Sequence, residues 1–101
     1  MTDFVAARSK AEKLAEACLG GMVRTKPDTW LRGEHLEARN CWLFLKARGI
    51  DFLPDCRESA DMAFVVSKKG KVMSVADHHE DMAALRAYVE EVSAYLERRG
   101  E

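Results

Sequence analysis

The sequence predicts an α+β fold in which three helices pack on a small antiparallel sheet, in the order α-α-β-β-β-α. Two observations predict the helices at the ends: apolar residues recur at helical spacing over residues 4–18 and again over residues 82–96. A third predicts the sheet, because two short apolar runs flank a glycine-containing turn at residues 63–75. With 101 residues, 48% hydrophobic and 33% charged, the chain suits one globular domain over residues 1–101.

The first helix is predicted over residues 3–19. Its apolar stripe recurs at intervals of three and four residues and consists of Phe4, Ala7, Ala11, Leu14 and Cys18. Thr2 is the expected N-cap, because its hydroxyl can accept a backbone N–H of the first turn. Gly20-Gly21 is expected to end the helix.

Residues 22–33 are expected to contain a loop, since Thr25-Lys26-Pro27-Asp28 interrupts regular structure, and Met22-Val23-Arg24 at its start fits either a short strand or the exit from the first helix. Trp30 within it has two interpretations. It is either an anchor in the hydrophobic core or, with Arg32 beside it, a hot spot for binding a partner.

The second helix is predicted over residues 34–48. Glu34 and Glu37 suit the start of a helix, and Lys46 and Arg48 suit its end. The run from 41 to 45, Cys-Trp-Leu-Phe-Leu, also fits a buried strand, and periodicity alone does not decide between the two. The flanking Glu, Ala, Arg and Lys residues favour the helix.

Residues 50–53 are expected to form a short edge strand that stops at Pro54, followed by an acidic loop or helical turn at 54–61. A hairpin follows, with Lys68-Lys69-Gly70 as its turn and Gly70 in a positive-φ conformation. This turn places Val66 opposite Val72 and Val65 opposite Met73. Both faces of the hairpin are apolar, so either both are covered or one is a contact surface.

The last helix is predicted from about residue 78 to residue 99. Asp77 is the expected N-cap, and Glu80 would complete a capping box. Gly100 follows the helix as a C-terminal cap. The apolar stripe expected to face the sheet consists of Met82, Leu85, Val89, Val92 and Leu96.

No catalytic set, metal site or cofactor is expected, so the chain is predicted not to be an enzyme. The cysteines Cys18, Cys41 and Cys56 form no Cys-x-x-Cys pair, and Cys56 lacks a neighbouring base. His78 and His79 are adjacent, and adjacent helical side chains point about 100° apart, so both rarely bind one ion. A polar first helical turn is therefore favoured there over a zinc site.

The net charge of −1 is unevenly distributed, with a basic hairpin turn after an acidic segment. We therefore expect a small non-enzymatic protein–protein interaction module that acts by occupying a surface, of the inhibitor, immunity, phage accessory or adaptor type. The first alternative is a winged-helix-like nucleic-acid-binding protein that uses the lysine-rich turn. A small metal- or thiol-dependent enzyme is the second alternative. The candidate binding residues are Trp30, Arg32, Lys68, Lys69, Lys71, Asp55, Glu58 and Asp61.

The expected partner is a protein, nucleic acid is a second option, and no membrane partner is expected. A homodimer is a further possibility, formed through an apolar hairpin face or a helix stripe. The first residues lack the basic and apolar regions of a signal peptide, and no apolar run reaches the length of a membrane span. The chain is therefore expected to be cytoplasmic.

Overall fold

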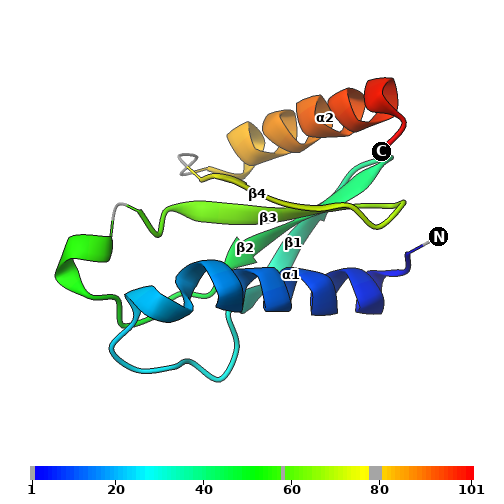
Figure 1. Ribbon diagram of the computed structural model, residues 1–101. Coiled ribbons are helices and arrows are strands. Elements are labelled where there is room, and N and C mark those ends of the chain that lie inside the picture. Colours follow the sequence, from blue (N-terminus) through cyan, green and yellow to red (C-terminus); the bar gives the residue numbers. More distant parts are fainter. Residues whose placement is uncertain (1, 58, 78–80) are drawn as a thin grey trace.

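The computed structural model describes residues 2–57, 59–77 and 81–101. Within these ranges, two α-helices and four strands follow one another in the order α-β-β-β-β-α (Figure 1). Their bounds are α1 (Phe4–Leu19), β1 (Leu31–Glu37), β2 (Cys41–Lys46), β3 (Met62–Ser67), β4 (Val72–Ala76) and α2 (Met82–Arg99), with short 3-10 helices η1 (Gly20–Met22) and η2 (Pro54–Cys56).

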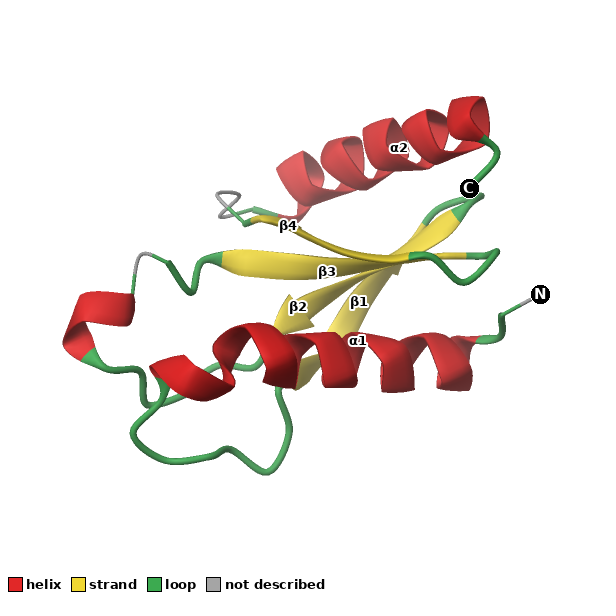
Figure 2. Ribbon diagram, viewed as in Figure 1, coloured by secondary structure: helices red, strands yellow, loops and turns green. Residues whose placement is uncertain are grey.

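The four strands form one antiparallel sheet in the order β1-β2-β3-β4. Helix α1 covers one face and helix α2 covers the other, so the sheet is the middle of three layers (Figure 2). The α+β class is therefore confirmed. The expectation of three helices in the order α-α-β-β-β-α is wrong.

The error lies in residues 34–48, which form the end of β1, a turn and β2 instead of a helix. Strand β2 pairs with β1 on one side and β3 on the other, and both of its faces are covered. Phe44 packs on the α1 side, and Leu43 and Leu45 pack on the α2 side. A central strand covered on both faces has no polar side to show, so its apolar run is continuous instead of alternating.

Helix α1 has the predicted extent, with a different N-cap. Asp3, and not Thr2, caps it, because its side-chain oxygen accepts the Ala6 N–H at 2.8 Å. Four residues of α1 are fully buried: Ala7, Ala11, Ala15 and Leu19. In the second half of the helix, the buried positions are therefore 15 and 19 and not the predicted 14 and 18. Alanine at the buried positions lets the helix lie close to the sheet.

The β3–β4 hairpin has the predicted register, with Val66 opposite Val72 and Val65 opposite Met73. Gly70 has the expected positive φ, 103°. Val66 is buried in the cluster under α1, and Val65 is buried in the cluster under α2. Both faces of the hairpin are therefore covered, which was one of the two options for it, and neither is a fully open apolar surface.

Helix α2 begins at Met82, later than predicted, and its N-cap is Asp81 instead of Asp77. The Asp81 carboxylate accepts the Ala84 N–H at 2.8 Å. The capping box with Glu80 lies outside the described residues. The stripe Leu85, Val89 and Leu96 is buried on the sheet, so it is not free to serve as a dimer seam, and Met82 is 49% exposed.

The segment between β2 and β3 contains no extended strand among its described residues. Phe52 forms only an isolated bridge with Val23, so the edge strand expected at 50–53 is wrong. The helical turn that was one option for residues 54–61 is present as η2. This segment lies at the opposite end of β3 from the β3–β4 turn (Figure 1).

Candidate binding surface at the hairpin end of the sheet

The predicted binding residues lie at two opposite ends of the sheet. Strand β3 starts after the acidic segment that contains Asp55 and Asp61, and it ends at the turn that contains Lys68 and Lys69 (Figure 1). Strand β1 is antiparallel to β2, which places its first residues, next to Trp30, at the acidic end. The eight residues therefore do not form one surface, and Glu58 lies outside the described residues.

Trp30, at the acidic end, is a core residue and only 4% exposed. Its backbone N–H and that of Leu31 donate to the Glu12 carboxylate of α1, at 3.1 and 3.0 Å. The hydroxyl of Thr29 donates to the same carboxylate. Trp30 is thus anchored in the core and offers little of its side chain to a partner.

Two other predicted residues at the acidic end, Arg32 and Asp61, also have contacts within the chain. The Arg32 side chain donates from Nε to the Lys46 carbonyl oxygen at 2.9 Å. The Asp61 carboxylate lies 3.6 Å from the Lys46 ammonium. Asp55 is exposed in η2.

We use the term hairpin end for the opposite end of the sheet, where the β1–β2 turn, the β3–β4 turn and the end of α2 meet. A groove of about 460 Å³ lies there. Its lining residues are Arg39, Asn40, Lys68, Lys69, Leu96, Glu97, Gly100 and Glu101. Two of the predicted binding residues, Lys68 and Lys69, are thus brought together with two groups of residues that are distant in sequence, at the β1–β2 turn and at the end of α2.

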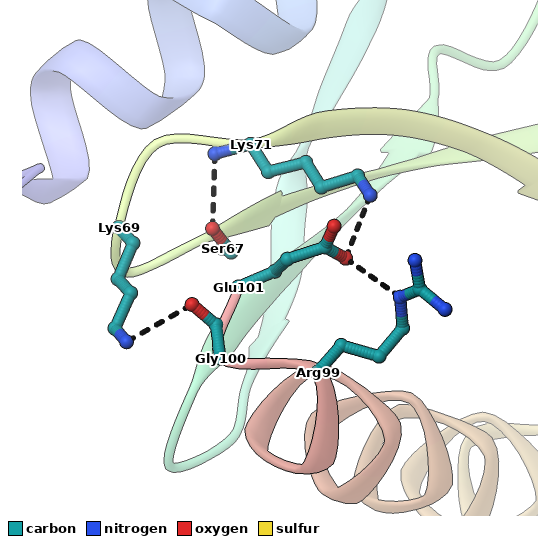
Figure 3. A network of polar contacts seen from close by, with 6 residues as sticks. All are labelled: Ser67, Lys69, Lys71, Arg99, Gly100 and Glu101. Atoms are coloured by element: carbon teal, nitrogen blue, oxygen red, sulfur yellow. Dashed lines mark hydrogen bonds and ion pairs between the residues drawn. The ribbon is translucent and has the colours of Figure 1, made fainter.

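The lysines of the β3–β4 turn connect it to the end of α2 (Figure 3). Lys69 donates from Nζ to the Gly100 carbonyl oxygen at 3.0 Å, and the Lys71 ammonium lies 2.7 Å from the Glu101 carboxylate. The hydrogen bond from Lys71 lowers the pKa of Glu101 below its ordinary value. The Arg99 side chain donates to the same carboxylate at 3.3 Å. These contacts hold the turn against the helix end.

Lys68 connects the same turn to β1 and β2. Its ammonium pairs with the Glu37 carboxylate and lies 4.0 Å from the centroid of the Trp42 ring, a cation–π arrangement. The hydrogen bond from Lys68 is the largest cause that lowers the pKa of Glu37. Only 22% of the Lys68 side chain is exposed, so it belongs more to the scaffold than to a contact surface.

Arg39 is far more solvent-accessible than Lys68. Its side chain is 82% exposed and lies 3.9 Å from the Glu97 carboxylate. The neighbouring Asn40 fixes the turn, because its N–H donates to the Ser93 hydroxyl at 3.0 Å and its amide donates to the Ser93 carbonyl oxygen at 3.1 Å. Sequence reasoning missed both residues because it placed them in a helix. Asn before an apolar run is a turn signal that could have found them.

The charges of the groove are mixed. Its lining holds the cations Arg39 and Lys69 and the carboxylates of Glu97 and Glu101, and it also includes the apolar Leu96. Such a surface can form ion pairs with both signs of charge, as a protein surface presents them. A nucleic-acid backbone presents negative charge alone, so the carboxylates would oppose it.

The cysteines and histidines have no shared site within the described part of the chain. Burial raises the pKa of the Cys41 thiol to about 11. The ring of His35 packs between the rings of Phe4 and Phe44, with centroids 4.6 and 5.9 Å away. His78 and His79 lie outside the described residues, and no group of three or more potential metal ligands occurs among those that are described.

Comparisons with protein-family models, curated proteins and solved structures found no match. Among the described residues, no helix has the length and apolar character needed to cross a membrane. The geometry of the hairpin end is therefore the basis for the functional proposal.

Proposed function

We propose that this chain is a non-enzymatic protein–protein interaction module, of the inhibitor, immunity, phage accessory or adaptor type, that binds a protein partner through its hairpin end. One observation carries the proposal: the exposed cations Arg39 and Lys69 flank a groove that also holds the carboxylates of Glu97 and Glu101. The partner surface would carry an acidic group for the two cations and a basic group for the two carboxylates.

The anchoring of the two turns supports this proposal. Asn40 ties the β1–β2 turn to Ser93, and Lys69 ties the β3–β4 turn to Gly100. Groups that are held before binding lose less conformational entropy when a partner docks. The ion pair between Arg39 and Glu97 is solvent-exposed, and such pairs contribute about 0–1 kcal/mol, so a partner can replace it at small cost.

Nucleic-acid binding has less support. The winged-helix layout required a helix at residues 34–48, and that segment forms strands. Lys68 of the supposed wing lies against the Glu37 carboxylate, and Lys71 lies against the Glu101 carboxylate.

We propose a cytoplasmic setting for the protein, because Cys18, Cys41 and Cys56 are free thiols, as is usual in a reducing compartment.

The proposal is tested by comparing two double charge reversals in affinity capture from the native cell lysate. R39E/K69E changes the groove, and R24E/K26E changes two exposed cations of the loop at the other end of the molecule. Each variant has the same net charge, so a general electrostatic effect would alter both equally.

The expected result is that wild type and R24E/K26E retain a common protein partner, which R39E/K69E loses while it remains folded by circular dichroism. Equal capture by all three proteins would exclude the hairpin end as the binding surface. If wild type instead recovers nucleic acid, and R39E/K69E does not, the proposal of a protein partner is contradicted.

A further inference from the structure

The two edges of the sheet differ in how open they are to another strand. On β1, the pairing is irregular between Leu31 and His35. The Arg8 guanidinium donates to the Leu31 and Arg32 carbonyl oxygens, at 3.3 and 3.1 Å. Irregular pairing and charged side chains protect an edge strand from pairing with another chain. Edge strand β4 is regular over Val72–Ala76 and carries no charge or proline within those bounds.

The backbone of β4 presents hydrogen-bonding groups outward at alternate residues. The Ser67 N–H donates to the Lys71 carbonyl oxygen, and the Asp77 N–H donates to the Asp61 carbonyl oxygen, at 2.8 and 3.1 Å. Because hydrogen-bonded and non-hydrogen-bonded pairs alternate along an antiparallel ladder, the odd-numbered residues of β4 bond to β3. The N–H and C=O groups of residues 72, 74 and 76 therefore point away from the sheet, and Ser74 and Ala76 are exposed.

We propose that this edge binds a second copy of the chain, with the two β4 strands antiparallel about a two-fold axis at Ser74. Val72 then faces Ala76 of the second copy, and Ser74 faces Ser74. These are the residues whose backbone groups point outward, so their hydrogen bonds are satisfied in this register. The two sheets join into a continuous sheet of eight strands, four from each copy.

Charge complementarity supports a second copy as the occupant. In the same register, Lys71 of each copy faces Asp77 of the other, so one lysine–aspartate ion pair lies on each side of the axis. No ion pair of the Asp77 carboxylate is found with any residue in the described ranges. Lys71 already contacts Glu101, but its side chain is 41% exposed and an ammonium has three donors.

The apolar residues beside this edge also fit a second copy. Met73 and Val75 are only half-buried, since α2 packs mainly over β1 and β2. The symmetric register places Met73 opposite Val75 of the second copy, in a non-hydrogen-bonded pair where side chains are close. The pairing would thus cover apolar surface that the single chain leaves partly exposed.

The two-fold axis gives a direct test, because residue 74 is predicted to face itself. By sedimentation, wild type should have twice the 11.4 kDa chain mass at high micromolar concentration. S74K and S74D each place like charges opposite one another and should weaken the dimer by about fivefold. An equimolar mixture of S74K and S74D should recover the dimer as a heterodimer, because lysine then faces aspartate.

A second pair of variants tests the backbone bonds. S74P removes the outward N–H from both copies and should weaken the dimer by at least about tenfold, whereas S74T keeps that N–H and should dimerise like wild type. A monomeric wild type would overturn the proposal. So would S74K and S74D dimers as tight as wild type, or a mixture that dimerises no better than either variant alone. These charge variants decide the matter if S74P does not fold.

Discussion

The Glu12 carboxylate holds the entry to β1 against α1, and its removal should destabilise the fold far more than the removal of other α1 carboxylates. It accepts the backbone N–H groups of Trp30 and Leu31 and the hydroxyl of Thr29. In the variant E12A, the Trp30 N–H loses its acceptor in the buried core. The Leu31 N–H keeps only a longer contact of 3.4 Å with the Thr29 hydroxyl, which in turn can donate to the Leu31 carbonyl oxygen at 3.2 Å.

The expected loss follows from the two backbone hydrogen bonds. A hydrogen bond to a charged group contributes about 1.5–3 kcal/mol, and Glu12 is only half-buried, so the lower value applies to each. E12A should therefore lower the free energy of unfolding by about 3 kcal/mol. For a domain of this size, that corresponds to a fall in Tm of about 15 °C.

Urea unfolding followed by tryptophan fluorescence measures this loss, because Trp30 and Trp42 are both buried. The matched control is E16A, which removes an exposed carboxylate of the same helix that lies 3.4 Å from the Lys26 ammonium. That change should cost less than about 0.5 kcal/mol. If E12A and E16A unfold within about 1 kcal/mol of each other, the anchoring role of Glu12 is refuted.

Two further predictions concern ionisable groups. With a pKa of about 11 caused by burial, Cys41 should resist alkylation in the folded protein at mildly alkaline pH, whereas the half-buried Cys18 and Cys56 should react before it. Mass spectrometry of iodoacetamide-treated protein identifies the modified residues. The hydrogen bond from Lys68 lowers the pKa of Glu37 from its ordinary value of 4.5. The stability that this pair contributes to the fold is therefore complete above pH 4.5 and is lost as the pH falls through the lowered pKa. K68M should therefore lose less stability than wild type between about pH 6 and pH 3, and urea midpoints that fall in parallel for the two proteins would contradict this.

The elements with a single buried stripe or a turn marked by glycine could be predicted from the sequence. Helix α1 and the β3–β4 hairpin have the expected positions, and the body of α2 has the expected stripe. Each leaves a periodic pattern, because only one of its faces is buried or because a glycine marks its turn. The register of the hairpin followed from Gly70, whose positive φ fixes the turn length.

The central strand β2 could not be predicted in this way. Its run Cys41 to Leu45 is buried on both faces and therefore has no period, and polar flanks that suited a helix decided the assignment wrongly. The start of α2 was also misplaced, because Asp77 and Asp81 are both acceptable N-caps and the local sequence does not decide between them.

The candidate site was predicted only in part for a related reason. Lys68 and Lys69 stood out as a basic turn, and both line the groove. Arg39 and Asn40 reach the same groove only because β1 and β2 form a second hairpin, which the sequence analysis did not contain. Contacts such as that between Lys69 and Gly100 join residues far apart in the chain, and no local pattern records them.

The most direct test of the proposed interaction is site-specific photo-crosslinking in the native cell. A photoreactive phenylalanine derivative is placed at Arg39, in the groove, or at Arg24, in the loop at the far end of the molecule. The account predicts that light produces one discrete protein adduct from position 39 and none from position 24. Adducts from position 24 alone, or none from position 39 when the protein is folded, would contradict binding through the hairpin end.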